Sequence, residues 1–400
     1  MAVVGGKGIE VVLAGMKRHD TDSGVQIQGL KAMKNMALGD PAIVAKILEL
    51  GGLEAIRKAM KDQGGDEMCQ EAGVLACLAV TDGKENLEFW DFDEQRQIEL
   101  EGSYARLWAS GVVKLVLKAM RQFRMNENIL GSGCEMLSLC ARNEGNQGHF
   151  PREGAIETVL DSMRRFEGHH QILIQGTKVL CSLASAHSEN TKEIAETRGL
   201  DVLVGALKRH TAHPEIEWHI CRALCFMTYE SVSNRLKIGQ LSGLETVLGN
   251  MQTHSSHPGV VEQGCLFIRN FTASEPENRE KISLDGGLKT IIKGMELHPD
   301  HPGVQEQGCQ ALYFLSLNSP DNRLEIGNLR GCETVIKALS SHLEHPGVAE
   351  EGSRALWNLV HQNSQNRERV LRLQGLELAR EVFGRFRLEV VEKLIEKLQT

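Results

Sequence analysis

Residues 276–318 read PENREKISLDGGLKTIIKGMELHPDHPGVQEQGCQALYFLSLN, and this stretch decides the fold. Residues 276–282 predict the start of a short helix, and Gly286 suits the left-handed turn that ends one. Apolar residues then recur at intervals of three and four over residues 288–295, which predicts an amphipathic second helix. Pro302 breaks that helix and starts a third segment, because proline is favoured at the first position of a helix. The stretch therefore predicts three helices, one short, one medium and one long, joined by tight turns.

The same pattern returns every 44 residues. A glycine precedes or opens the second helix at the same place in five consecutive stretches, at Gly199, Gly243, Gly287, Gly331 and Gly375. The third-helix glycine keeps the same interval at Gly264, Gly308 and Gly352. An asparagine does so at Asn146, Asn190, Asn234, Asn278, Asn322 and Asn366. Three signals with one period predict an α-solenoid, in which each repeat buries its apolar face only against its neighbours. We expect one domain of about nine repeats over residues 1–386, followed by a capping helix over residues 387–400.

The repeated motifs resemble those of the armadillo repeat family. They are Asn-Arg in the short helix, Gly-Gly-Leu before the second helix and Glu-Gln-Gly-Cys-x-Ala-Leu in the third. The resemblance covers about residues 5–386. It implies an all-α, right-handed armadillo-repeat superhelix whose third helices line a concave groove for extended peptides or partner domains. Most members of that family are non-enzymatic adaptors, so the resemblance also implies that this chain is not an enzyme.

Two departures from the repeat are informative. The first repeat starts at its second helix, so no short helix covers that edge. Either Met1 is not the native start of the chain, or this edge packs end to end on another molecule. An insertion near residues 83–101 carries Phe89, Trp90 and Phe92 among acidic residues. It is a candidate docking motif for a partner, or a flap over the neighbouring groove. The alternative is a loop whose aromatic rings cover a local gap in the core.

The resemblance also indicates which residues face the groove. By register, these positions lie two, five and six residues after the third-helix glycine. Aromatic residues make up only 4% of the chain, yet they gather on the third helices of its second half. The candidate partner-binding residues are Trp218, Arg222, Phe226, Tyr229, Arg269, Asn270, Tyr313, Phe314, Arg354, Trp357 and Asn358. Exposed Trp, Tyr and Arg are enriched at binding hot spots. We therefore expect an extended peptide, acidic or aromatic, whereas the alternative is that these side chains only pack between helices.

Histidines form two columns between the second and third helices, and they invite a metal-binding interpretation. The pair returns in successive repeats without a further ligand type, as a structural turn does. We therefore assign the histidines to turn structure and expect no metal and no cofactor.

Composition and motifs exclude several function classes. The net charge of −8 argues against a nucleic-acid binder, which needs clustered basic residues. No apolar run reaches membrane-spanning length, and the N-terminus lacks a signal-peptide layout. Ten cysteines without a Cys-x-x-Cys pair predict reduced thiols and a cytoplasmic location. The phosphate-binding loop, the nucleophile elbow and the zinc-protease motif are all absent from the sequence.

The sequence thus predicts a protein-binding scaffold or adaptor. The main alternative is a structural subunit of a cytoskeletal, ciliary or other multiprotein assembly. A nuclear-transport adaptor ranks third, because no repeat has the paired Trp and Asn that nuclear-import members of the family use.

Overall fold

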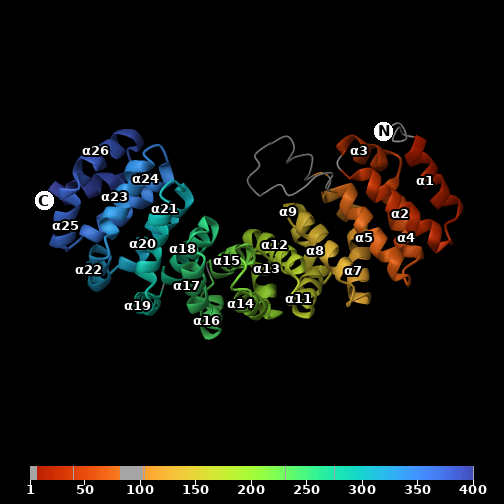
Figure 1. The fold of residues 1–400 in the computed structure, drawn as a ribbon, viewed down its shortest axis with the longest axis horizontal. Helices are drawn as coiled ribbons and strands as arrows, with labels where there is room; N and C mark the ends of the chain where they lie inside the picture. The colour runs from red at the N-terminus through yellow and green to blue at the C-terminus, as the bar shows by residue number, and fades with distance from the viewer. Residues whose placement is uncertain are drawn as a thin grey trace. The chain divides into compact units, whose positions relative to one another are not determined.

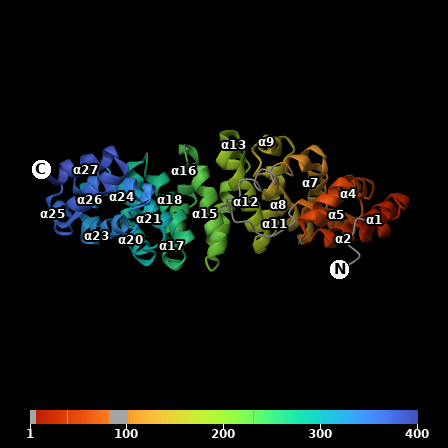
Figure 2. The same ribbon diagram turned by 90° about the horizontal axis from the view of Figure 1, so that it is seen from above.

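The computed structural model describes residues 7–38, 40–81, 102, 104–229, 231–273 and 275–399. Every regular element within these ranges is a helix, which confirms the all-α prediction (Figures 1 and 2). The chain forms two compact units, Met1–Val202 and Leu203–Thr400, called here the N-terminal and C-terminal units. Within the described ranges, no helix combines the length and the apolar character that crossing a bilayer requires.

The N-terminal unit starts at a second helix and then follows the order of short, medium and long helices. Its helices are α1 (Lys7–Arg18), α2 (Ser23–Ala37), α3 (Pro41–Glu49), α4 (Gly52–Asp62), α5 (Glu67–Thr81), α7 (Val112–Gln122), α8 (Glu127–Cys140), α9 (Glu144–Gln147), α10 (His149–Arg152), α11 (Ala155–Arg165), α12 (His170–Ala186) and α13 (Ser188–Glu196). Residues 104–109 are also helical. The predicted insertion at residues 83–101, with Phe89, Trp90 and Phe92, lies outside the described residues.

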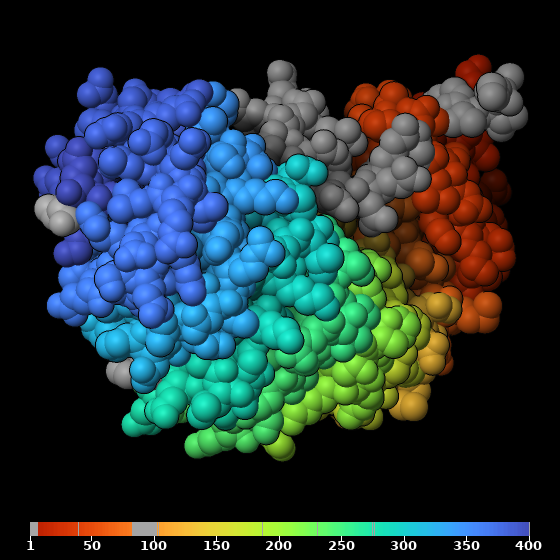
Figure 3. Space-filling view, turned by 60° about the vertical axis from the view of Figure 1, so that its left-hand side comes forward, coloured from red at the N-terminus to blue at the C-terminus, as the bar shows by residue number. Residues whose placement is uncertain are grey.

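The C-terminal unit follows the same order. The sequence boundary between the units falls within α14 (Gly199–Arg209). The helices that follow it are α15 (Pro214–Thr228), α16 (Val232–Gln240), α17 (Gly243–Thr253), α18 (Pro258–Thr272), α19 (Pro276–Leu284), α20 (Gly287–Leu297), α21 (Pro302–Ser316), α22 (Pro320–Asn328), α23 (Gly331–Ser341), α24 (Pro346–Val360), α25 (Ser364–Arg372), α26 (Gly375–Phe386) and α27 (Glu389–Gln399). The third helices α15, α18, α21, α24 and α27 pack against one another in that order. In the space-filling view, the repeats of this unit follow one another as adjoining bands from green to blue (Figure 3).

A close contact between the second and third helices explains the third-helix glycine. In α21, a Cβ added to Gly308 would lie 2.6 Å from Cγ of Met295 in α20. A Cβ on Gly176 would lie 2.7 Å from Sδ of Met163. The repeat at α14 and α15 holds Leu207 and Ile220 at these two positions, and both side chains are fully buried. The third-helix glycine is thus needed where the second-helix side chain lies over it, and not in every repeat.

The glycine at the start of the second helix also recurs every 44 residues, and a different contact explains it. Gly287 opens α20, and a Cβ there would lie 2.8 Å from the backbone oxygen of Ile282. The left-handed residue is the one before it, Gly286, whose φ is 80°. Ser242 and Arg330 hold that left-handed place in neighbouring repeats without being glycines. The recurring glycine is thus selected by close approach of two helices, and not by its backbone angle.

The asparagine ladder closes the ends of the third helices. Nδ2 of Asn322 donates to the backbone oxygen of Leu315 at 2.7 Å, and Asn146, Asn190, Asn234, Asn278 and Asn366 make the equivalent bond. Where an arginine follows the asparagine, its side chain also bonds to a helix end. Nη1 of Arg279 donates to the backbone oxygen of Leu317, at the end of the next third helix, at 2.9 Å. The Asn278-Arg279 pair of α19 therefore links the end of the preceding third helix, α18, to the end of α21, the third helix of its own repeat.

Candidate partner-binding face

The candidate residues of the second half lie on consecutive third helices of the C-terminal unit. We call the third-helix face the set Trp218, Arg222, Phe226 and Tyr229 of α15 and its end, Arg269 of α18, Tyr313 and Phe314 of α21, and Arg354 and Trp357 of α24. All of these side chains are half-buried except Tyr229, which is 55% exposed. The register prediction therefore identified side chains that are at least partly exposed.

Two predicted residues are placed differently. Asn270 and Asn358 are 7% and 2% exposed. Nδ2 of Asn270 donates to the backbone oxygen of Cys225 at 2.9 Å, and Nδ2 of Asn358 donates to Oγ of Ser316 at 2.7 Å. Each amide thus joins its helix to the preceding third helix. The two asparagines pack and orient the third helices, and we leave them out of the third-helix face.

Arg354 is held in place by carboxylates and a ring. Its Nη2 lies 2.6 Å from Oε1 of Glu350, and its Nη1 lies 3.0 Å from Oε1 of Glu351. The guanidinium carbon lies 5.9 Å from the ring centroid of Tyr313, a cation–π distance. Burial raises the pKa of Glu351, and Arg354 opposes that rise. The charge of Arg354 is therefore already balanced within the protein, which weakens its case as an anchor for an acidic ligand.

The three arginines of the third-helix face differ in how far their charge is balanced within the protein. Arg222 lies close enough to Glu262 to lower the pKa of that carboxyl, although burial raises it more. Arg269 is half-buried, and within the described residues its guanidinium has neither a hydrogen-bond partner nor an ion-pair partner. Arg269 is thus the arginine of the third-helix face whose charge no described residue balances.

Two glutamates that sequence reasoning missed border the face. Glu262 and Glu306 hold the position of Trp218 in the next two repeats. Each side chain reaches over the glycine at the start of the next third helix, so that a Cβ on Gly259 would lie 3.0 Å from Trp218 and one on Gly303 would lie 2.7 Å from Glu262. The recurring Gly of the His-Pro-Gly turns was the signal for these side chains. A carboxylate over a helix N-terminus is also favoured by the helix dipole.

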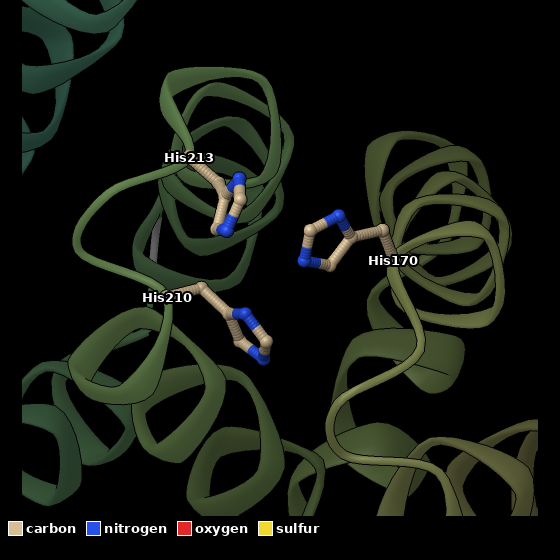
Figure 4. A group of neighbouring side chains, drawn as sticks. All are labelled: His170, His210 and His213. Carbon is tan, nitrogen blue, oxygen red and sulfur yellow. The ribbon is translucent and has the colours of Figure 1, made fainter.

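Three histidines of each column make hydrogen bonds to the backbone. In the first column, Nε2 of His298 lies 2.8 Å from the backbone oxygen of Ser255 in the preceding turn, and His254 and His342 make the same link at 2.8 Å. In the second column, Nδ1 of His301 accepts from the backbone N–H of Val304 at 3.2 Å and so caps α21. His210 and His213 flank the turn between α14 and α15, with ring centroids 6.1 Å apart (Figure 4). His170, also labelled there, opens α12 of the N-terminal unit.

Glu217 is a buried acid that the sequence did not reveal. Its side chain is 0% exposed, and neither carboxyl oxygen has a hydrogen-bond partner. Nε2 of His254 lies 3.5 Å from Oε2. Burial raises the pKa of Glu217 to about 8. In the same third-helix position of a later repeat, Gln305 donates Nε2 to the backbone oxygens of Met295 and His298 at 2.9 Å and 2.8 Å.

Comparisons with known proteins agree with this architecture. A family model described as the LRRK2 ARM repeat matches residues 109–242, and one described as the spinocerebellar ataxia type 10 protein domain matches residues 216–284. A comparison with curated proteins finds no match.

Solved structures are similar in fold at low sequence identity. An engineered protein from a structural genomics consortium is 17% identical, with 98% of this chain and 99% of that chain covered and a TM-score of 0.73. A structure reported for the phosphorylation switch that controls the interaction between cadherin and beta-catenin is 14% identical, with coverages of 98% and 71% and a TM-score of 0.74. A designed armadillo repeat protein is 15% identical, with coverages of 62% and 99% and a TM-score of 0.53.

Proposed function

Because the chain is an armadillo-repeat protein, we propose that it is a non-enzymatic scaffold that binds an extended peptide of a partner protein along the third-helix face. The structure reported for cadherin and beta-catenin supports the general role, since its subject is an interaction between proteins. The residues of the third-helix face carry the more specific part of the proposal.

One observation supports the position of the peptide. Arg269, Tyr313 and Trp357 occupy one register on the successive helices α18, α21 and α24, and all three are half-buried. Helices pack at spacings of about 8–10 Å, and an extended peptide rises about 3.3 Å per residue. Successive helices therefore meet side chains about three residues apart in the peptide.

This spacing defines the ligand that we propose. An acidic side chain pairs with Arg269, whose charge is not balanced by a described neighbour. Aromatic or aliphatic side chains about three and six residues away then pack on Tyr313 and Trp357, which offer large faces at a small loss of side-chain entropy. The carboxylates of Glu262, Glu306 and Glu350 border the face and disfavour a ligand that is acidic throughout. The partner segment therefore carries one acidic residue followed by apolar ones.

We also propose a cytoplasmic location. All ten cysteines are free thiols in the structure, and nine of them are buried. Free thiols persist in a reducing compartment.

The alternative of a structural subunit has one observation in its favour. Val11, on the open edge of the first repeat, is 71% exposed. Val12 and Val25 beside it are half-buried, whereas the equivalent Ile56 and Cys69 of the next repeat are fully buried. An assembly in which another molecule covers that edge explains such an apolar surface.

A capture experiment tests whether the third-helix face binds the peptide. Partners captured from a lysate by the wild-type chain are compared with those captured by an Arg269→Ala/Tyr313→Ala/Trp357→Ala variant. We expect the affinity for the captured peptide to fall at least about 30-fold, which corresponds to about 2 kcal/mol. Arg372→Ala is the matched control, because this exposed arginine belongs to α25, the first helix of its repeat, and not to the third-helix face. Normal binding by the triple variant, with loss of binding after deletion of residues 85–99, would assign the site to the insertion.

A further inference from the structure

The N-cap position of the third helices changes its chemistry along the chain. In the N-terminal unit, the capping oxygen of α2 belongs to Asp22, that of α5 to Asp66 and that of α8 to Asn126. In the C-terminal unit, Nδ1 of His257, His301 and His345 accepts the equivalent backbone N–H at 3.2, 3.2 and 3.3 Å. His169 of α12 already makes this bond, more weakly, at 3.4 Å. One structural task is therefore performed by oxygen acceptors in one set of repeats and by imidazoles in the other.

The two kinds of cap respond differently to protons. A carboxylate or an amide keeps its oxygen acceptor at every pH between about 5 and 8. An imidazole accepts through Nδ1 only while that nitrogen is unprotonated, and histidine titrates within this range. Once Nδ1 carries a proton, two donors face each other and the cap is lost.

We propose that the third-helix caps of the C-terminal unit form a proton-sensitive device, in which acidification releases His257, His301 and His345 from the first turns of α18, α21 and α24. The first turns then open locally, while the oxygen-capped helices α2, α5 and α8 stay closed. The proposal concerns the helix starts and is independent of what binds the third-helix face.

Charged neighbours of these rings favour their protonation and therefore the loss of the cap. Oε2 of Glu262 lies 3.9 Å from Nδ1 of His301, and Oε2 of Glu306 lies 3.9 Å from Nδ1 of His345. Both carboxylates come from the preceding third helix and reach across the glycine of the His-Pro-Gly turn. A protonated ring therefore has an anionic partner close by. Acidification exchanges a cap within the helix for an ion pair between repeats.

His257 has a different environment. At this position of the preceding third helix stands Trp218 and not a glutamate. The titratable groups that act on His257 are His254 and His298, which disfavour its protonated form, and Glu215, which favours it. Burial is the largest cause, and it lowers the pKa of His257. The protonated ring of His257 thus lacks the carboxylate that His301 and His345 have, and α18 is expected to open only at a lower pH than α21 and α24.

Hydrogen exchange resolved to short peptides tests the device in the whole chain. Amide protection, corrected for intrinsic exchange rates, is measured at pH 7.5 and at pH 5.5. We expect protection to fall about fivefold in the first turns of α21 and α24, the loss that corresponds to one N-cap, and to fall less at α18, where the pKa of His257 is lowered. The first turn of α8, capped by Asn126, is the control within the same molecule and is expected to keep its protection.

A variant with the acceptor of α8 provides the second arm. The triple variant His257→Asn/His301→Asn/His345→Asn restores a pH-independent cap and is expected to protect all three first turns at both pH values. The single variant His301→Asn gives the same result at α21 alone, in case the triple variant folds poorly. An equal loss of protection at α8, or an unchanged pH response of α21 in His301→Asn, would overturn the proposal.

Discussion

Met295 lies on Gly308 so closely that a Cβ on the glycine would come within 2.6 Å of Cγ of the methionine. We therefore expect Gly308→Ala to destabilise the chain by about 1–3 kcal/mol, the usual effect of overfilling a packed core. The measurement is the free energy of unfolding in denaturant. Gly249→Ala is the matched control, because Gly249 also lies within a helix and a Cβ there meets nothing within 4 Å. That control is expected to stabilise by up to about 1 kcal/mol, since alanine is the better helix former.

A second substitution tests whether the contact itself is responsible. Met295→Ala removes the side chain that the new Cβ would strike, so the double variant should lose less stability than the sum of the two single variants. Additive effects would mean that Gly308 is required for another reason, such as the local backbone.

Periodicity predicted the fold because one interval linked three independent signals. Residues 276–318 were expected to form a short, a medium and a long helix, and α19, α20 and α21 lie there. The register also placed Tyr313 and Trp357 on the surface and the thiol of Cys309 in the core. Such predictions succeed where a repeat imposes the same environment many times.

The pattern did not show how side chains pair across repeats. Arg354 was expected to meet a ligand, yet Glu350 and Glu351 bind it, and only the three-dimensional arrangement brings all of these charges together. Asn358 was expected on the surface. Register alone, however, cannot decide whether a residue at the boundary between the buried and exposed faces of a helix is buried. Its amide turns toward the preceding helix, where Ser316 accepts its hydrogen bond.

The asparagine ladder leads to a stability prediction. Asn322 is 7% exposed and donates to the backbone oxygen of Leu315. Asn322→Ala leaves that buried oxygen unpaired, so we expect a loss of about 1–3 kcal/mol in chemical denaturation. Glu325→Ala, at an exposed position of the same helix α22, should change stability by less than about 0.5 kcal/mol. Similar effects of the two variants would contradict a structural role for the ladder.

The last helix carries the prediction of a terminal cap. In α27, Val391, Leu394 and Leu398 are buried, and the helix packs against α24 and α26. Leu394→Ala is therefore expected to destabilise the chain by about 2–5 kcal/mol. Lys393→Ala, one residue earlier and exposed, should have little effect, since surface ion pairs contribute little. The melting temperatures of both variants test this prediction. An unaltered melting temperature in Leu394→Ala would mean that α27 does not cap the core.

Glu217 leads to a prediction about pH. Its pKa is raised to about 8 by burial, whereas an unfolded glutamate titrates near 4.3. Between these values the folded protein binds one proton more than the unfolded chain, so the stability from Glu217 falls as pH rises through this window. The fall is at most about 1.4 kcal/mol for each pH unit and ends above pH 8. Glu217→Gln removes the charge and supplies amide protons for the carbonyls of Leu207 and His210, the counterparts of those that Gln305 binds.

We therefore expect Glu217→Gln to be more stable than the wild type, and the difference to grow from pH 5 to pH 8. Comparing the two proteins at each pH cancels the pH dependence of the groups that they share. The reciprocal variant, Gln305→Glu, is the matched control, because it places a carboxyl in a pocket built for an amide. It should lose stability, and increasingly so as pH rises. A constant difference between Glu217→Gln and wild type across this range would show that Glu217 is already ionised in the folded protein, with a counter-charge that compensates its burial.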